Sequence, residues 1–173
     1  MKLIATCGLL LMLQYCKQTQ RSDIEVIKFD NQIIVDLQKG SDTTYTEYTG
    51  QYESYIAEYF VNRSDSLITK ILKDSFENVV GLHVTKNDHL LTVAEYYRNG
   101  QLKGKLPEKI KGKYNGLARY YYEDGRVRSE GQFSNGLWSG EWKNYDEQGH
   151  LISIDDFGEG NITPLKTTKV KQP

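Results

Sequence analysis

The residues that could do chemistry in this chain of 173 residues are few and scattered. His83, His89 and His150 lack the short spacing and the cysteine partners that a zinc site needs. Asp155 and Asp156 could form an acid pair, but adjacent residues of a strand point to opposite faces of a sheet. The pattern therefore predicts no metal, no cofactor and no catalytic residue.

Two glycine-rich stretches have the wrong spacing for catalytic motifs. Residues 100–106 are one residue short between the glycines for a phosphate-binding loop, and Leu106 stands where Ser or Thr must contact the metal. In residues 136–140, Ser139 comes one position late for a nucleophile elbow. We therefore expect a protein that is not an enzyme and has no small-molecule substrate. The net charge of −1 gives no reason to expect nucleic acid binding either.

The N-terminus has the pattern of an export signal. Residues 3–13 form an apolar run that is shorter than the roughly 20 residues needed to span a bilayer, and it matches the hydrophobic part of a signal peptide. Residues 13–16 resemble a bacterial lipobox ending in Cys16, although Tyr15 occupies a position where a small residue is usual. The alternatives are an ordinary secretory signal or an apolar start without function. Because Cys7 and Cys16 are the only cysteines, the folded body cannot contain a disulfide.

These features predict a signal peptide over 1–15, lipidation at Cys16 and a polar tether over 16–23. The protein would then be exported and anchored by lipid to a membrane of the cell envelope, at its periplasmic or surface face. Without the anchor it would be secreted.

The strongest internal signal is a repeat of 24 residues between 116 and 160. It aligns Tyr121 with Tyr145 and Gly125 with Gly149. Such a repeat has room for one β-hairpin, which cannot bury a core alone and must stack on its neighbours. We expect Gly100, Gly125 and Gly149 to form the hairpin turns.

The dipeptide Asp124-Gly125 favours a two-residue type I′ turn, which fixes the strand register. That register pairs Arg119 with Glu130 and Tyr121 with Arg128 across the hairpin. The equivalent tyrosines and this arginine would form a ladder that binds a protein segment, because such residues dominate binding hot spots. The alternative is that they only cover the sheet. The ladder consists of Tyr96, Tyr121, Arg128 and Tyr145.

The rest of the chain is less regular. Residues 24–37 predict a short hairpin around Asp30-Asn31, and residues 103–113 predict a long loop. Residues 56–62 match 93–99, which favours strands from 45 to 76, with a helix over 67–76 as the alternative. We therefore expect an N-terminal β region over 24–94 and a disordered tail over 161–173.

Residues 95–102, 116–127 and 140–145 resemble the MORN-repeat variant family, most closely bacterial proteins labelled antitoxin-component-like. The resemblance implies an all-β fold of tandem hairpins stacked into an elongated, curved antiparallel sheet, with the repeats over 95–160. It also implies no catalysis. The expected function is a non-enzymatic, envelope-anchored module that binds or scaffolds an unknown protein partner. The alternative is an antitoxin that binds and neutralises a toxin, against which the export signal counts.

Overall fold

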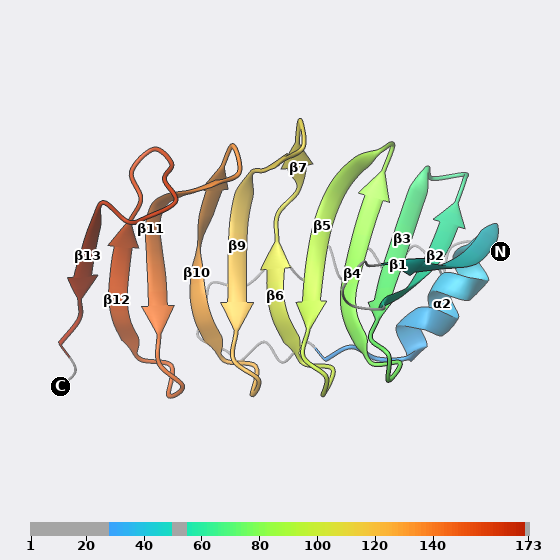
Figure 1. Cartoon of the computed structure of the whole chain (residues 1–173), viewed down its shortest axis with the longest axis horizontal. Coiled ribbons are helices and arrows are strands. Elements are labelled where there is room, and N and C mark those ends of the chain that lie inside the picture. Colours follow the sequence, from blue (N-terminus) through green and yellow to red (C-terminus); the bar gives the residue numbers. More distant parts are fainter. Residues whose placement is uncertain (1–27, 50–54, 172–173) are drawn as a thin grey trace.

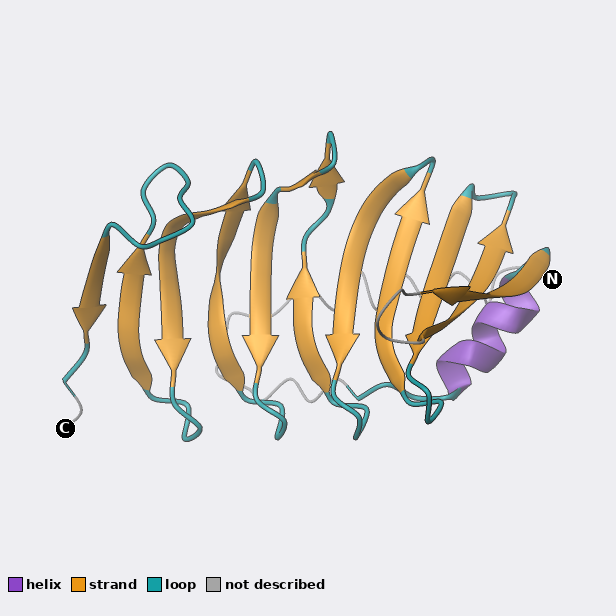
Figure 2. Cartoon of the chain, viewed as in Figure 1, coloured by secondary structure: helices purple, strands orange, loops and turns teal. Residues whose placement is uncertain are grey.

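The computed structural model describes residues 28–49 and 55–171. The predicted signal peptide over 1–15, the predicted lipidation site Cys16 and the predicted tether over 16–23 lie outside the described residues. The described part forms one helix and one long antiparallel sheet, with a separate two-stranded hairpin (Figures 1 and 2). The all-β architecture of stacked hairpins is confirmed.

The chain order of the elements is almost the spatial order of the sheet, β1-β2-β3-β4-β5-β6-β9-β10-β11-β12-β13. Each strand therefore pairs with strands close to it in sequence, and the stack extends along the long axis in Figure 1. The elements are α2 (Gln32–Gly40), β1 (Thr43–Thr49), β2 (Tyr55–Asn62), β3 (Leu67–Lys73), β4 (Val79–Lys86), β5 (His89–Tyr96), β6 (Leu102–Leu106), β7 (Lys109–Ile110), β8 (Lys113–Tyr114), β9 (Gly116–Tyr121), β10 (Val127–Ser134), β11 (Leu137–Tyr145), β12 (Leu151–Asp156) and β13 (Lys166–Lys169).

The two faces of the sheet carry different side chains. The first, here called the packed face, buries a cluster of aliphatic side chains and two tyrosines on β4, β5, β6 and β9, namely Leu82, Val84, Ala94, Tyr96, Leu102 and Tyr121. Phe29, from the segment before α2, packs edge-on against Tyr96 with ring centroids 5.3 Å apart. The second, here called the aromatic face, carries Tyr59, Tyr120 and Trp142, as the strand register requires.

The hairpin turns differ from the expected type. Gly125 donates its backbone N–H to the carbonyl of Tyr122, and its φ is +93°, whereas Asp124 does not have a positive φ. This geometry is a longer turn with one left-handed glycine, so the expected two-residue type I′ turn is wrong. Gly100 and Gly149 have the same conformation, with φ of +83° and +88°, which confirms the three glycines as turn residues.

The longer turn is accompanied by a bulge in β10, which changes the register. Arg119 faces Glu130 as predicted, but Tyr121 faces Val127, with the irregularity between Val127 and Ser129. The predicted pairing of Tyr121 with Arg128 is therefore wrong. A bulge places an extra residue in one strand and re-aims the side chains beside it.

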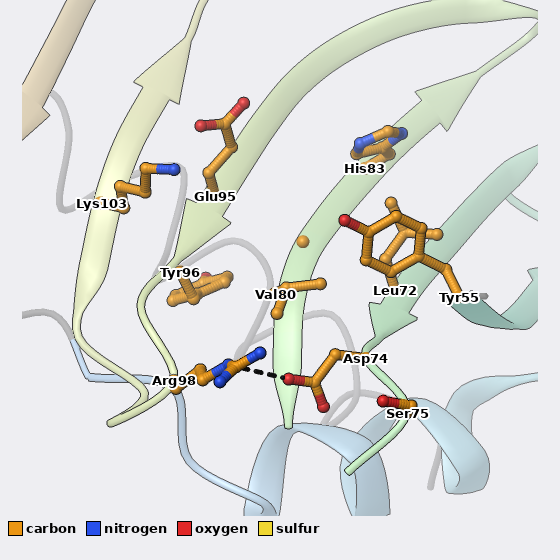
Figure 3. A pocket seen from close by; sticks show the side chains of 11 residues that line it. Tyr55, Leu72, Asp74, Ser75, Val80, His83, Glu95, Tyr96, Arg98 and Lys103 are labelled. Atoms are coloured by element: carbon orange, nitrogen blue, oxygen red, sulfur yellow. Dashed lines mark ion pairs between the residues drawn. The ribbon is translucent and has the colours of Figure 1, made fainter. Parts of the chain in front are cut away.

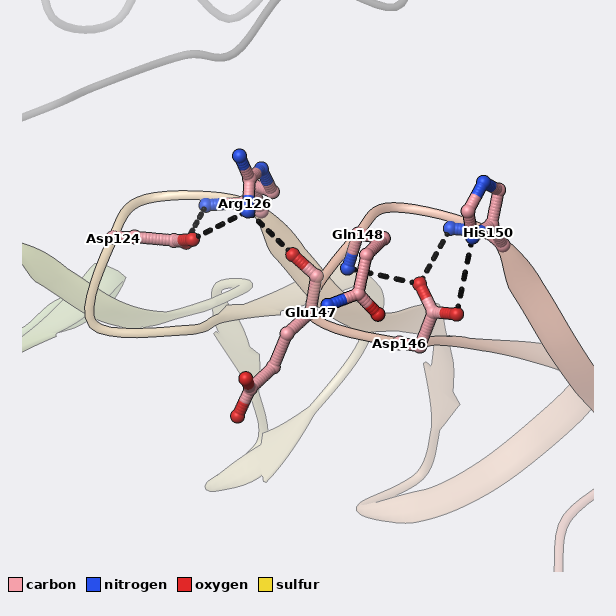
Figure 4. A network of polar contacts seen from close by, with 6 residues as sticks. All are labelled: Asp124, Arg126, Asp146, Glu147, Gln148 and His150. Carbon is pink, nitrogen blue, oxygen red and sulfur yellow. Dashed lines mark hydrogen bonds and ion pairs between the residues drawn. The ribbon is translucent and has the colours of Figure 1, made fainter.

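Two tyrosine hydroxyls join neighbouring hairpins. Tyr97 donates to the backbone carbonyl of Tyr121 at 2.8 Å, and Tyr122 donates to that of Tyr145 at 2.7 Å. The equivalent residue of the next turn is Asp146, whose carboxylate instead accepts the backbone N–H of His150 within its own turn (Figure 4). The hydroxyl ladder therefore ends at the third turn.

Two predicted local structures are wrong, and so is the alternative helix over 67–76, where the favoured strand is confirmed. Residues 32–40 form α2 rather than the second strand of a hairpin; Asp30 Oδ1 accepts the Gln32 N–H at its start. The alternative helix over 67–76 is β3 up to Lys73, because β3 pairs along its whole length with both β2 and β4. Within the expected disordered tail, β13 pairs with β12.

The long loop expected over 103–113 is also largely structured. β6 continues to Leu106, and β7 and β8 then form a small hairpin of their own. This hairpin carries Lys109 to the aromatic face, where its positive charge acts on His83.

Candidate functional site

The structure separates the residues of the predicted binding ladder. Tyr96 and Tyr121 are buried on the packed face, with only 5% and 2% of their surface exposed. Tyr145 is partly buried, and its hydroxyl donates to Glu130 Oε1 at 2.9 Å. Arg128 instead lies on the aromatic face, 5.9 Å from the ring centroid of Tyr120. The burial of Tyr96 and Tyr121 leaves a partner almost no surface to contact, whereas a binding role for Arg128 and Tyr145 stays a prediction.

The surroundings of Tyr145 stabilise the neutral form of its hydroxyl. Burial and the hydrogen bond to Glu130 raise the pKa of Tyr145 to about 12. The hydroxyl therefore stays protonated at neutral pH. Glu130 on β10 also forms an ion pair with Arg119 on β9, in which Nη2 and Oε2 are 2.8 Å apart. The Tyr145 hydroxyl thus connects β11 to this ion pair.

The aromatic face is built from rings that lie over glycines. A Cβ atom at Gly131 would come within 2.3 Å of the Trp142 ring, and one at Gly104 within 2.9 Å of Tyr120. Trp142 also donates from Nε1 to the carbonyl of Gln132 at 3.1 Å. The two glycines therefore let the rings lie flat against the sheet. Sequence reasoning missed this arrangement, although glycines inside strands rather than in turns were the available signal.

Further rings extend this surface towards both ends of the sheet. Trp142 packs edge-on against Phe133 at 5.5 Å, and Trp138 does so against Phe157 at 5.0 Å. At the other end, Tyr45 and Tyr59 stack with centroids 4.5 Å apart. Trp138 and Tyr45 remain 39% and 43% exposed, so the aromatic face includes exposed aromatic surface.

Cations lie over several of these rings. Lys70 Nζ is 6.0 Å from the Tyr59 centroid and Lys109 Nζ is 4.6 Å from that of Tyr114. Together with Arg128 over Tyr120, this makes three cation–aromatic contacts along the aromatic face. Such contacts are attractive because the face of an aromatic ring is negative.

A hollow of about 740 Å³ lies over β3, β4, β5 and β6 (Figure 3). Its lining includes Gly81, which has no side chain, and Leu72, His83, Glu95 and Lys103 around it. The Arg98–Asp74 ion pair, with Nε and Oδ2 3.2 Å apart, lies at one end, as Figure 3 shows. The hollow is thus partly apolar and partly charged.

The surroundings shift the pKa values of two titratable groups in the lining of the hollow, Asp74 and His83. Burial opposes the ionised form of Asp74, but hydrogen bonds from Asn78 and Phe76 and the nearby Arg98 outweigh it and lower the pKa of Asp74. Its carboxylate thus holds the turn after β3. Burial, followed by the positive charges of Lys70 and Lys109, lowers the pKa of His83 to about 4, so this imidazole is neutral at pH 7.

Residues 28–49 and 55–171 contain neither a cluster of potential metal ligands nor a helix that could span a membrane. No cluster of three or more His, Cys, Asp or Glu side chains there could hold a metal ion. Nor does this part of the chain contain a helix with the length and apolar character needed to cross a membrane.

The fold and its surface define a repeat protein of stacked hairpins with an aromatic, cationic face. Residues 92–107, 114–135 and 138–157 match the MORN repeat variant, so the chain carries three such repeats. MORN repeats are commonly modules that bind proteins or membranes. The matched stretches agree with the repeat region expected over 95–160.

No curated protein matches the chain. Among solved structures it is similar to the crystal structure of TarM, at 8% identity over 95% of this chain and 27% of that one, with a TM-score of 0.41. It is also similar to a mutant of S. aureus TarM in complex with Fondaparinux, alpha-GlcNAc-glycerol and UDP, at 9% identity over 98% and 32%, with a TM-score of 0.38. The chain thus spans about a third or less of each, and likeness at this level carries no functional inference.

Proposed function

We propose that this protein is a non-enzymatic binding module of the cell envelope that holds a partner protein on its aromatic face. The observation that carries the proposal is the single-layered sheet. Among the described elements, only α2 and the β7–β8 hairpin lie outside this sheet. The aromatic face therefore presents rings and cations instead of packing under a second layer.

The chemistry of the aromatic face fits protein recognition. Aromatic side chains and arginine carry most of the energy in protein interfaces, because they combine large apolar area with directed polar contacts. Trp138, Tyr45 and Arg128 are all exposed on this face. MORN repeats, as protein- or membrane-binding modules, are consistent with this use.

A pair of charge variants in β10 tests the proposal. Arg128 and Gln132 are both exposed, but Gln132 faces away from Tyr120 on the packed side. A tagged full chain would be cross-linked in the native envelope and purified as wild type, Arg128→Glu and Gln132→Glu. We expect a protein that co-purifies with the wild type and with Gln132→Glu but is lost or strongly reduced with Arg128→Glu. Equal recovery with both variants would overturn the proposal.

The anchor is a separate part of the proposal. It rests on the lipobox-like residues 13–16, and Cys16→Ala is expected to move the protein from the membrane fraction to the soluble fraction. Unchanged fractionation would contradict the anchor without affecting the binding face. The antitoxin alternative expects something different, namely a soluble, stoichiometric complex with a toxin.

A further inference from the structure

The two faces of the sheet balance their charges differently. On the packed face, ion pairs join neighbouring strands: Lys73 Nζ lies 2.6 Å from Glu58 Oε1, and Arg119 Nη2 lies 2.8 Å from Glu130 Oε2. These two strand-to-strand ion pairs lie on the same face. The packed face therefore neutralises much of its own charge.

The centre of the aromatic face instead keeps cations without acidic partners. Among the described residues, Lys70, Lys103 and Lys109 form no ion pair within 4.0 Å. Lys70 and Lys109 both act on the imidazole of His83 and, after its burial, help to lower its pKa. Charges from β3 and β7 thus act on one place, and no acidic side chain of the described residues forms an ion pair with them there.

Two of these lysines are held against aromatic rings rather than left free in solvent. Lys70 lies over Tyr59 and Lys109 over Tyr114, at 6.0 and 4.6 Å from the ring centroids. A cation positioned by a ring loses less side-chain freedom when it binds an anion, so less conformational entropy opposes binding. The arrangement is therefore prepared for a negatively charged ligand.

The dimensions of the surface suit a short extended chain. Lys70 on β3 and Lys103 on β6 are three strand spacings apart in the sheet, which corresponds to about 14 Å at about 4.8 Å for each spacing. An extended peptide covers that distance with about five residues, and alternate side chains point to the same side. The hollow over Gly81, with Leu72 and Tyr55 in its lining, could accept an apolar side chain between two acidic ones.

The carboxylate of Glu95 favours an acidic peptide over a phosphate chain as the ligand of these lysines. Glu95 lines the same hollow, next to Lys103 in Figure 3, and no ion pair or hydrogen bond of its carboxylate is seen within the described residues. A chain made of phosphate groups alone has no donor for this carboxylate and would be repelled by it. A peptide has a backbone N–H at nearly every residue, which can satisfy Glu95 while acidic side chains contact the lysines.

We propose that the centre of the aromatic face binds an extended acidic segment of the partner protein, with its carboxylates on Lys70, Lys103 and Lys109 and an apolar side chain in the hollow over Gly81. This inference rests on the proposed function and names the chemistry of the partner.

The test measures peptide binding to the full chain, purified in a neutral detergent. The probe is a fluorescein-labelled heptapeptide in which Glu and Phe alternate, and its affinity is measured by fluorescence polarisation at low salt. For Lys70→Glu/Lys109→Glu we expect Kd to rise by about tenfold or more, because two attractive contacts become repulsive. The matched control is Lys143→Glu/Lys166→Glu, which makes the same change in net charge at exposed positions of the packed face. It should change Kd less than about twofold, and circular dichroism would show that both variants fold.

Three results would overturn the inference. The first is an equal loss of affinity in both double variants, and the second is equal binding of a peptide with Lys in place of Glu. The third is an oligogalacturonate that binds more tightly than the acidic peptide and displaces it, which would assign the surface to acidic glycans.

His83 supplies a second readout. Carboxylates bound beside Lys70 and Lys109 would offset their charge, so the pKa of His83, about 4 in the free protein, should rise when the peptide saturates the site. Imidazole NMR titration measures this shift directly, and an unchanged pKa would contradict the placement of the peptide.

The two proposals can fail separately. If the envelope partner is lost with Arg128→Glu but no acidic peptide binds, the peptide chemistry is wrong and the binding face stands. If the peptide binds through the lysines but no envelope protein depends on Arg128, the proposed function is wrong.

Discussion

Gly131 determines whether the aromatic face can form at all. The Trp142 ring occupies the space where a Cβ atom would be, only 2.3 Å from the ideal position. Gly131→Ala is therefore expected to lower the free energy of unfolding by about 1–3 kcal/mol, the usual cost of overpacking a filled site. Urea denaturation measures the change.

Gly81→Ala is the matched control for this prediction. Both glycines lie in strands and neither has a positive φ. At Gly81, however, the nearest atom to a Cβ is the flexible Cδ1 of Leu72, at 3.2 Å. A Gly131→Ala variant no less stable than Gly81→Ala would contradict the packing of Trp142 described above.

His83 gives the protein a pH-dependent stability with a defined sign. Because burial, Lys70 and Lys109 lower its pKa in the folded state to about 4, the unfolded chain binds a proton more readily between about pH 4 and the ordinary histidine pKa of about 6.5. Stability from this group is therefore present above pH 6.5 and decreases as the pH falls towards 4. Solvent screening of the partly exposed ring limits the loss to about 1–2 kcal/mol.

Comparison with His83→Gln isolates this contribution. Urea unfolding at pH 7 and pH 5 should show that the wild type loses more stability than the variant. The same loss in both proteins would mean that His83 is not kept neutral by its surroundings.

At the scale of elements, the tyrosine hydroxyls of Tyr97 and Tyr122 connect one hairpin to the next. Replacing either with Phe keeps the ring and removes a hydrogen bond to a backbone carbonyl, which should cost about 1 kcal/mol. Tyr48→Phe is the control because Tyr48 is 84% exposed. Thermal unfolding with no difference among the three variants would show that the hairpins stack without these hydroxyls.

The sequence predicted the stacked hairpins because each repeat contains the residues that set the pairing of its two strands. The match between residues 121 and 145, the turn glycines and the Arg119–Glu130 pair all follow from local patterns. It could not predict which face Arg128 occupies, because that depends on a bulge of one residue in β10. A single extra residue reverses the face of a side chain, since strands alternate with a period of two.

The helix α2 was missed for a different reason. Residues 33–35, Ile-Ile-Val, favour a strand by intrinsic preference. In the structure, Ile33, Ile34 and Leu37 are its partly buried side chains and share one helical face, while Gln32 donates to Asp36 one turn later. The α2 segment lies at the β1–β2 end of the sheet, as Figure 1 shows. Its place there outweighs the intrinsic strand preference of residues 33–35.

At the scale of the whole molecule, the described elements form a sheet of one layer, and no second sheet among them covers its long surface. The packed face forms a core with Phe29, and its strand-to-strand ion pairs balance charge within the face. The aromatic face concentrates rings, unpaired lysines and the hollow. The same repeated hairpin thus supplies stability on one side and, in our proposal, recognition on the other.

The most direct test of the binding face is site-specific photo-cross-linking in the living cell. The photoreactive amino acid p-benzoylphenylalanine would replace Arg128 in one strain and Gln132 in another, which places it on opposite faces of β10 within one strand. We expect a discrete adduct with a partner protein from position 128 and none from position 132. Adducts of equal yield from both positions, or an adduct from position 132 alone, would contradict it.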